Sequence, residues 1–318
     1  MNFEISTIIA LGSGYLALLF GIAFVTERGW IPIKIVRHPI VYVLSLGVFA
    51  SVWAYYTSAG NAQRDGYGYL ASFIGISLAF LFSPLLLRPL LALTRTYQLS
   101  SLADLMAFRY RTPWAGTLTT LVILIAVTPL IALQIRAVSD TAYLLSPESA
   151  QGLLAIGFCV VITLFSILFG TSRKAGRTQY DGLVMAIAFE SLVKLIAFLA
   201  VGVFAIYGAF GSLDELDLWL QDQPELLASL KNTDYFSSFH VMALLFFTAA
   251  IAMPHMFYVT FNENNGQRAL SFASWGLPLY FLLLSLPVLP ILWAGLQSGS
   301  NVQVEYFPVV IGAAYDMP

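Results

Sequence analysis

Charged residues are scarce in this sequence, cysteine occurs once, and positive charge is not in excess. Only 10% of the 318 residues are charged, whereas 59% are hydrophobic. This composition lies far outside the range of water-soluble globular domains and excludes that class. The net charge of −2 provides no basic face to neutralise phosphates, so we expect no nucleic-acid partner. The single cysteine, Cys159, excludes an internal disulfide and Cys-rich zinc sites.

Familiar catalytic motifs are also missing. The sequence has no H-E-x-x-H, no G-x-S-x-G and no P-loop, which leaves metalloprotease, serine hydrolase and ATP-driven pump without support. We therefore predict no catalytic residue and no enzyme activity for these 318 residues.

Long apolar stretches dominate the sequence instead. A helix needs about 20 apolar residues to cross a bilayer core. The stretches of this length cover residues 5–25, 39–59, 68–92, 114–134, 151–170, 180–208, 238–261 and 272–296. They predict an all-α integral membrane protein with eight spanning helices. The first stretch lacks a basic n-region and a cleavage site, so we expect it to be a retained helix.

The positive charges predict the orientation of these helices. Cytoplasmic loops carry an excess of Lys and Arg, and with the N-terminus outside, 11 of the 15 positive charges fall in inner loops. The outer loops then hold Arg64, Arg136 and Lys231, and the outer connection at 209–237 is acidic. The sequence thus predicts a multi-pass protein of the inner (plasma) membrane with its N-terminus outside. The inner positions are Arg28, Lys34, Arg37, Arg88, Arg95, Arg109, Arg111, Arg173, Lys174, Arg177 and Arg268.

Two of the predicted helices contain features that indicate an interruption. The stretch ASVWAYYTSAGN at 50–61 crowds hydroxyls and rings, including Ser51, Trp53, Tyr55 and Tyr56. Irregular backbone at membrane depth is tolerated only where it faces protein or a wet cavity. This stretch is therefore a candidate for an unwound segment whose side chains face a bound solute. For Trp53, Tyr55 and Tyr56, ordinary helix packing stays open as the alternative.

The second predicted interruption lies at MPHMF, within the stretch 238–261. Pro254 has no N–H to donate and crowds the preceding turn, so it frees a carbonyl that could bind an ion or a solute. His255 either faces the same pocket or is a buried neutral side chain. Matching interruptions point to the binding site of an inverted-repeat transporter, so we expect both interruptions to face one solute pocket.

This pairing also predicts the domain organisation. No linker or second soluble domain is apparent, so residues 1–318 are predicted to be one membrane domain. The helix at 5–25 would be an extra one, 39–208 the first repeat and 238–296 the start of the second. The second repeat would be unfinished, and we expect the sequence to be a fragment.

Glu190 and Lys194 lie inside the sixth predicted span. At a spacing of four they share one helix face, and Glu190 falls close to mid-bilayer. Ionisable residues at this depth are rare and usually functional. Two hypotheses stay open: a structural ion pair that fixes helix packing, or a role in solute binding or proton coupling.

Four pieces of the sequence carry a family resemblance. The chain resembles the sodium:solute symporter family, and more closely the transporter-type sensor domain of bacterial sensor histidine kinases. These pieces are SLGVFASVWAYYTSAG (45–60), SSLADLMAFRYR (100–111), FGTSRKAGRTQYDGLVMAIAFESLVKLIAF (169–198) and MPHMFYVTFNENN (253–265).

The resemblance implies a LeuT/APC-like inverted-repeat fold and, in the parent protein, a cytoplasmic kinase region in cis. The family's sodium ligands would fall on Gly47, Ala50 and Ser51, and oxygen atoms are the ligands that such a cation needs. Some members carry an Asp where Phe49 stands, which puts sodium coupling in doubt, so coupling to Na⁺, coupling to H⁺ and no coupling all stay open. Ala54 stands where sugar transporters place a polar ligand, which argues against a sugar.

Together these observations predict a secondary-transporter-type domain for a small polar solute, an amino acid or an organic acid. In the parent protein it would be the nutrient-sensing input of a two-component sensor kinase. The expected partners are the solute, the lipid bilayer and the kinase region. The alternative is a membrane receptor or anchor that does not transport and only signals to that kinase.

Overall fold

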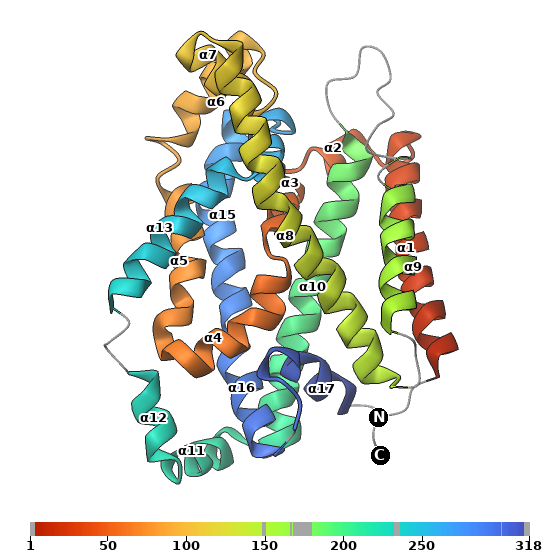
Figure 1. Cartoon of the computed structure of the whole chain (residues 1–318), viewed down its shortest axis with the longest axis vertical. Helices are drawn as coiled ribbons and strands as arrows, with labels where there is room; N and C mark the ends of the chain where they lie inside the picture. The colour runs from red at the N-terminus through yellow and green to blue at the C-terminus, as the bar shows by residue number, and fades with distance from the viewer. Residues whose placement is uncertain are drawn as a thin grey trace. The chain divides into compact units, whose positions relative to one another are not determined.

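In the computed structural model, the part of the chain that is described comprises residues 4–147, 151–165, 167, 180–231, 236–299 and 301–314. These residues form helices and no strand (Figure 1), which confirms the all-α prediction. The chain divides into two compact units. The first unit comprises Met1–Val48, Leu87–Glu190 and Ala252–Phe272, and the second comprises Phe49–Leu86, Ser191–Ile251 and Ala273–Pro318.

Four helices of the described chain are long and apolar enough to cross a membrane, or up to six if each of two interrupted pairs forms one span. The four are α1 (Ile5–Glu27), α8 (Pro113–Leu145), α10 with its continuation (Asp181–Phe210), and α15 with α16 (Gln267–Gln297). The interrupted pairs are Pro39–Phe49 with Trp53–Leu81, and Ser238–Ala252 with Pro254–Asn262.

The sequence predicted eight spans because it counted 39–59 and 68–92 separately and included 151–170. Part of that last stretch lies outside the described residues, and the apolar helix found within it, Gly152–Val161, is too short to be counted as a span. The count of eight and the inverted-repeat arrangement therefore stay predictions.

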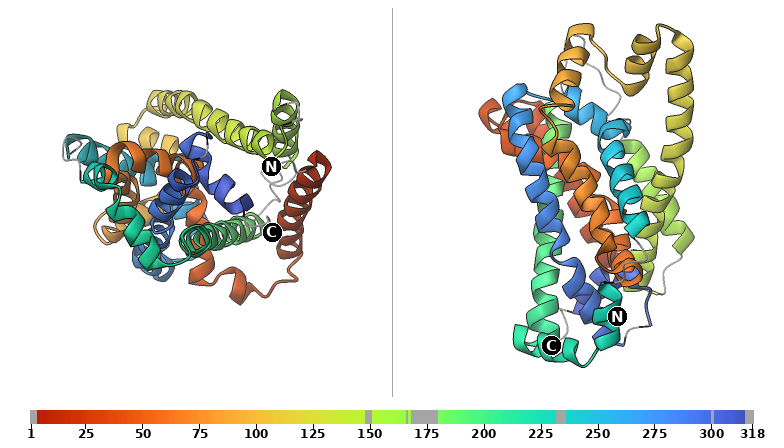
Figure 2. Two further views of the ribbon diagram at one scale, coloured as in Figure 1. Left: turned by 90° about the horizontal axis from the view of Figure 1, so that it is seen from below. Right: turned by 90° about the vertical axis from the view of Figure 1, so that its left-hand side faces the viewer.

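The first unit is built around α8. The tight connection from α7 to α8 contains Arg111 in the left-handed conformation, and Pro113 follows as the first residue of α8, a position that suits proline. Helix α9 packs along α8 (Figure 2). The other helices of the unit are α2 (Ile33–Val36), α3 (Pro39–Leu46), α6 (Leu87–Tyr97), α7 (Leu102–Tyr110), α9 (Gln151–Phe165), α14 (Pro254–Phe257) and the first parts of α10 (Asp181–Phe204) and α15 (Gln267–Ser285).

Helix α7 has a capped N-terminus, which leads to a prediction about pH. Ser101 Oγ accepts a hydrogen bond from the Asp104 N–H at 3.0 Å, and the Asp104 carboxylate accepts bonds from Ser100 N and Oγ. These bonds, that of the Ser100 hydroxyl above all, hold the pKa of Asp104 below its ordinary value against an opposing effect of partial burial. Because the pKa of Asp104 is lower in the folded state, its bonds stabilise α7 at any pH above the ordinary pKa of Asp. This contribution is lost as the pH falls through the lowered pKa.

We therefore expect the start of α7 to lose amide protection, relative to intrinsic exchange rates, when the pH is lowered from about 5 to about 3. Hydrogen exchange of residues 102–110 would measure this loss. Asp104→Asn should flatten the pH dependence of this protection, because the side-chain amide of Asn does not titrate. If the variant shows the same acid dependence as the wild type, Asp104 is not its source.

The second unit depends on close helix contacts at glycines. Gly66 has φ +54°, and a Cβ at this position would collide with the backbone of Leu230; a Cβ at Gly75 would collide with the carbonyl of Ala243. Close approach of another backbone at a glycine is typical of membrane helix packing. The helices of the unit are α4 (Ser58–Asp65), α5 (Leu70–Leu81), α11 (Leu213–Gln221), α12 (Pro224–Leu230), α13 (Phe236–Ala252), α16 (Val288–Gln297) and α17 (Phe307–Ala314), together with the second parts of α10 and α15.

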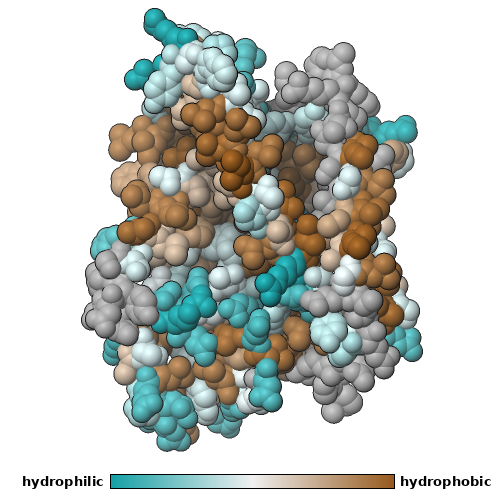
Figure 3. All heavy atoms as spheres, in the orientation of Figure 1, coloured by the Kyte–Doolittle hydropathy of each residue, from teal (hydrophilic) through white to brown (hydrophobic). Residues whose placement is uncertain are grey.

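The exposed surface of the first half of α8 is mostly apolar. Figure 3 shows hydrophobic side chains over this part of the helix and hydrophilic ones at the end formed by α6 and α7. Extended apolar surface of this kind is unusual on a protein in water and is expected against lipid. The exposed apolar residues in the first half of α8 are Leu118, Leu121, Val122, Leu124 and Ile125.

Hydrogen bonds in the first unit join chain segments that the sequence places on the same side of the membrane. Glu27 Oε1 accepts a bond from Gly182 N at 3.2 Å, and Asn262 Nδ2 donates to the Ser100 carbonyl at 2.7 Å. All four residues lie at ends predicted to face the cytoplasm. These contacts support the predicted alternation of the helices, while the side itself stays a prediction.

Candidate functional site

The first interrupted helix is irregular at Ala50 and Ser51. After α3 the chain forms a 3-10 turn (Gly47–Phe49), has no helical backbone at these two residues, and continues as a π-helical turn (Trp53–Thr57) into α4. π-Helical turns inside apolar helices occur frequently at functional sites. The predicted interruption is thus confirmed at Ala50 and Ser51, whereas the rest of the stretch 50–61, which was predicted to be unwound, is helical.

The second interruption lies at Met253, between α13 and α14. Met253 has extended backbone with ψ 133°, and Pro254 is the first residue of the next helix. The cause is local, because a proline disfavours helical backbone in the residue before it. The Phe257 N–H donates to the Met253 carbonyl at 2.8 Å, as at an ordinary helix start. This interruption is also confirmed.

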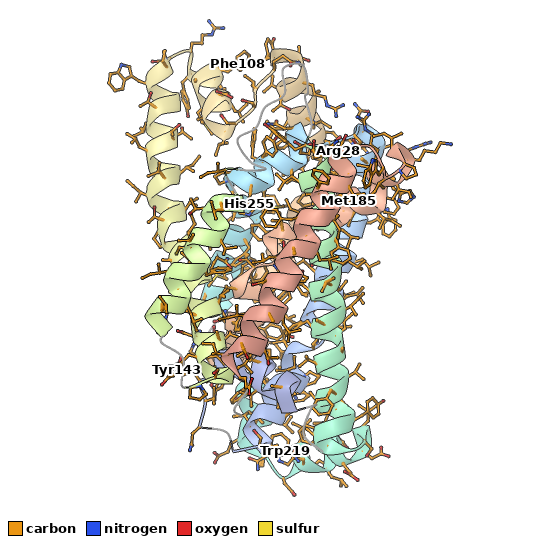
Figure 4. The ribbon with its side chains drawn as sticks, turned by 90° about the vertical axis from the view of Figure 1, so that its right-hand side faces the viewer. Arg28, Phe108, Tyr143, Met185, Trp219 and His255 are labelled. Carbon is orange, nitrogen blue, oxygen red and sulfur yellow. The ribbon has the colours of Figure 1, made fainter. Side chains whose placement is uncertain are left out.

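Figure 4 places His255 within the first unit. In that view Arg28 of α1 and Phe108 of α7 lie toward one end of the unit, Tyr143 of α8 lies toward the other, and His255 lies between them. The His255 side chain is half-buried. His255 therefore lies between the two ends of the unit, and its depth in a membrane stays a prediction.

Trp53 packs into an aromatic cluster of the second unit. Its ring centroid lies 4.7 Å from that of Phe246, 5.2 Å from that of Phe73 and 6.1 Å from that of Phe281. Its indole Nε1 donates to the Phe49 carbonyl at 2.7 Å. Trp53 thus satisfies a carbonyl at the interruption and fixes the start of the π-helical turn, whereas solute contact by its ring stays a prediction.

Tyr55 and Lys194 are brought together, although the sequence linked them to different features. The Lys194 Nζ lies 5.8 Å from the centre of the Tyr55 ring. The Tyr55 hydroxyl is 3.5 Å from that of Tyr280, which donates to the Ser191 carbonyl at 3.2 Å. The Phe198 and Tyr55 rings form an edge-to-face pair with a distance of 5.4 Å between their centroids. Lys194 and Phe198, four residues apart on α10, therefore both contact Tyr55 of the π-helical turn.

Tyr56 and Ser51 occupy the same interrupted segment as Tyr55. Both side chains are half-buried, and the Tyr56 ring contacts that of Tyr306 at 5.8 Å. One residue before Tyr306, Glu305 pairs with Arg64 of α4 at 3.5 Å. The segment before α17 therefore packs against the π-helical turn and α4.

Glu190 lies on α10 one turn before Lys194, as predicted. Within the first unit its carboxylate interacts electrostatically with Tyr15 of α1. The spacing of the two residues on a single helix is confirmed, because α10 is continuous from Asp181 to Phe204. The two hypotheses, structural ion pair or coupling, stay open.

The residues predicted to bind sodium lie at or next to the first interruption, and their role as ligands stays a prediction. Gly47 begins the 3-10 turn, Ala50 is buried, and the Ser51 carbonyl already accepts the Ala54 N–H at 2.9 Å. The carbonyls of Gly47 and Ala50 and the Ser51 hydroxyl fit a hard cation in chemical type. In the described part of the chain no three His, Cys, Asp or Glu residues cluster as metal ligands.

A buried polar network in the first unit escaped the sequence analysis. The side chain of Asn264 donates to the Tyr42 hydroxyl at 2.8 Å and accepts bonds from Arg95 at 3.2 Å and from Gly266 N at 2.6 Å. Tyr42 in turn donates to the Thr260 carbonyl at 3.0 Å. The polar run NENN at 262–265, directly after an apolar helix, is the signal that could have indicated it.

Two carboxylates hold the start of α10 in the same unit. Buried Glu263 accepts bonds from the Tyr180 N–H at 3.1 and 3.3 Å, and Glu27 accepts the Gly182 N–H. Carboxylates are favourable at this position because the N-terminus of a helix carries partial positive charge. Glu263 and Asn264 thus tie the end of the second interrupted helix to α10, α3 and α6.

Family models, curated proteins and solved structures provide no match to this chain. The resemblance to the sodium:solute symporter family therefore stays a prediction. Pro254 and His255 belong to the first unit, and Ser51, Trp53, Tyr55, Tyr56 and Lys194 belong to the second. That both interruptions face one pocket also stays a prediction.

Proposed function

We propose that this chain is a secondary-transporter-type membrane domain that binds and translocates a small polar solute, an amino acid or an organic acid. The observation that carries the proposal is the irregular backbone at Ala50–Ser51 and at Met253, each within an otherwise apolar helix. Lipid-exposed backbone is not left irregular, because its polar groups would be unsatisfied. A helix that serves only as an anchor needs no interruption, whereas transporters use interrupted helices to bind solutes and ions.

The proposal extends to the parent protein through the family resemblance. There the domain would be the nutrient-sensing input of a sensor histidine kinase in the inner membrane, with the kinase region in the cytoplasm. Na⁺ or H⁺ would be the coupling ion. Coupling to Na⁺ and coupling to H⁺ differ in the ion gradient that drives uptake, so one uptake experiment separates them.

Uptake by proteoliposomes that contain the full chain tests this function. We expect saturable uptake of a radiolabelled amino acid or carboxylic acid, driven by an inward sodium gradient or by an inward proton gradient. Pro254→Ala should lower the uptake rate about tenfold or more, because a proline-free sequence favours a regular helix at the interruption. The matched control is Pro129→Ala inside α8, where the helix is already continuous.

The outcomes also distinguish a transporter from a receptor that binds the solute without moving it. Saturable binding without uptake would contradict transport and favour the receptor hypothesis. Neither binding nor uptake of any amino or carboxylic acid would overturn the proposed function. Equal loss of uptake in Pro254→Ala and Pro129→Ala would show that the interruption at Met253 has no special role.

A further inference from the structure

We propose that the groove between α8 and α9 binds a zwitterionic phospholipid, with the lipid phosphate on the Arg136 guanidinium and an acyl chain along the groove. None of the residues that line this groove belongs to an interrupted helix. The inference therefore goes beyond the proposed function and does not rest on it.

The groove lies in the first unit, where α9 packs along α8. Its volume is about 480 Å³, which is within the range of small-molecule sites. Gly152 and Ala155 of α9 leave room for it, and a Cβ at Gly152 would meet nothing within 4 Å. Ala132 and Ile135 of α8 make its lining apolar toward the middle of that helix, and the next turn supplies a polar lining of Arg136, Ser139 and Asp140. A lipid has the same division into an apolar chain and a polar head group.

The position of Arg136 along α8 places its side chain at the level of lipid head groups. Residues 112–135 carry no charge, and the helix rises about 35 Å from Pro113 to Arg136 at about 1.5 Å per residue. The hydrocarbon core of a bilayer is about 30 Å thick. A helix that has Arg111 at one membrane surface therefore has Arg136 at the other, where a basic side chain reaches lipid phosphates.

Arg136 has hydrogen-bond donors that a phosphate can use. Its Nε–H donates to Asp140 Oδ2 at 3.3 Å, which orients the guanidinium beside the groove. A guanidinium has five N–H donors, and no residue of the described chain accepts a hydrogen bond from Nη1 or Nη2 of Arg136. The side chain is 72% exposed, so a phosphate can approach it and accept two parallel bonds.

Asp140 determines which head group fits the site. Its carboxylate pairs with the Arg136 guanidinium and lines the same groove, so the pair is neutral as a whole. A zwitterionic head group such as phosphoethanolamine is also neutral, and it brings a positive amine near the carboxylate when its phosphate binds Arg136. A head group with a net negative charge would place a second negative charge beside Asp140, and like charges repel each other.

Lipids that share their acyl chains and differ in the head group test this inference. Native mass spectrometry of the purified full chain in detergent would measure the apparent Kd of the dioleoyl forms of phosphatidylethanolamine, phosphatidylglycerol and diacylglycerol. We expect phosphatidylethanolamine to bind about tenfold more tightly than diacylglycerol, which has no phosphate, and about threefold more tightly than the anionic phosphatidylglycerol. Inorganic phosphate should not displace the bound lipid, because it has no chain to occupy the groove.

Variants assign the binding to the groove. Arg136→Met should weaken binding of phosphatidylethanolamine about tenfold, and Gly152→Leu, which fills the groove and leaves the charges in place, about three- to tenfold. Arg64→Met is the matched control, because Arg64 is also exposed, pairs with a carboxylate and does not line the groove. It should bind the lipid like the wild type. Thermal unfolding of each variant without added lipid separates a loss of binding from a loss of folding.

Each contrary result overturns a stated part of the inference. Equal binding of phosphatidylethanolamine and diacylglycerol, or unchanged binding by Arg136→Met, would contradict the phosphate contact. Unchanged binding by Gly152→Leu, or displacement of the lipid by inorganic phosphate, would contradict the acyl-chain site. Tighter binding of phosphatidylglycerol would overturn the choice of a zwitterionic lipid. Solute uptake is measured separately, so none of these results decides the proposed function.

Discussion

Gly66→Ala is expected to destabilise the protein by about 3 to 5 kcal/mol, the larger of two stability effects predicted for the fold. Gly66 has φ +54° and ψ −132°, a conformation that essentially only glycine adopts. A Cβ here would also collide with the backbone of Leu230, which has no flexible side chain to move away. Unfolding in mixed detergent micelles, followed by circular dichroism, measures the change in free energy.

Variants of two other glycines separate the cost of backbone strain at a positive φ from the cost of a steric collision. Gly29 has φ +75° with nothing within 4 Å of an added Cβ, so Gly29→Ala should cost only about 1 kcal/mol. Gly75 has no positive φ, but its Cβ would collide with the Ala243 carbonyl, so Gly75→Ala tests the collision alone. If Gly66→Ala lowers the free energy of unfolding no more than Gly29→Ala does, the close approach of Gly66 to Leu230 is wrong.

Asn264→Ala should cost about 2 to 4 kcal/mol, since it removes three hydrogen bonds and leaves buried polar groups without partners. The Gly266 N–H and the Arg95 guanidinium lose an acceptor, and the Tyr42 hydroxyl loses a donor. Asn264 and Tyr42 are both almost fully buried, with exposed fractions of 2% and 1%. Water is therefore unavailable to replace the lost bonds without rearrangement.

The neighbouring residue provides the control for this variant. Asn265 is exposed, and Asn265→Ala should change the free energy of unfolding by less than about 0.5 kcal/mol. A double-mutant cycle of Asn264→Ala with Tyr42→Phe should give a coupling energy of about 0.5 kcal/mol or more, because the two side chains share a hydrogen bond. Additive effects in this cycle would contradict the network.

The features that the sequence revealed are those with local causes. Pro254 disturbs the residue before it whatever the rest of the chain does, and the hydroxyl- and ring-rich run 50–61 is unusual within a span. The spacing of Glu190 and Lys194 follows from helix geometry alone. Each of these predictions depends on residues within one or two turns of each other.

The features that the sequence did not reveal depend on long-range contacts. Tyr280 meets Tyr55 across 225 residues, and Asn264 meets Tyr42 across 222. No pattern along a single sequence specifies such pairs, because tertiary packing selects them. The role of Asn264 was hidden for a second reason: a polar run after a helix also suits an ordinary solvated loop.

Trp53 is placed so that its intrinsic fluorescence can report on the interrupted helix. Its indole N–H is bonded to the Phe49 carbonyl at 2.7 Å, and four aromatic rings lie around it, those of Phe49, Phe73, Phe246 and Phe281. The chain has six tryptophans, so replacing the other five by phenylalanine would leave one emitter at the irregular backbone. Any rearrangement that separates the indole from this carbonyl then changes the wavelength of its fluorescence, and conformational cycling becomes visible without an attached dye.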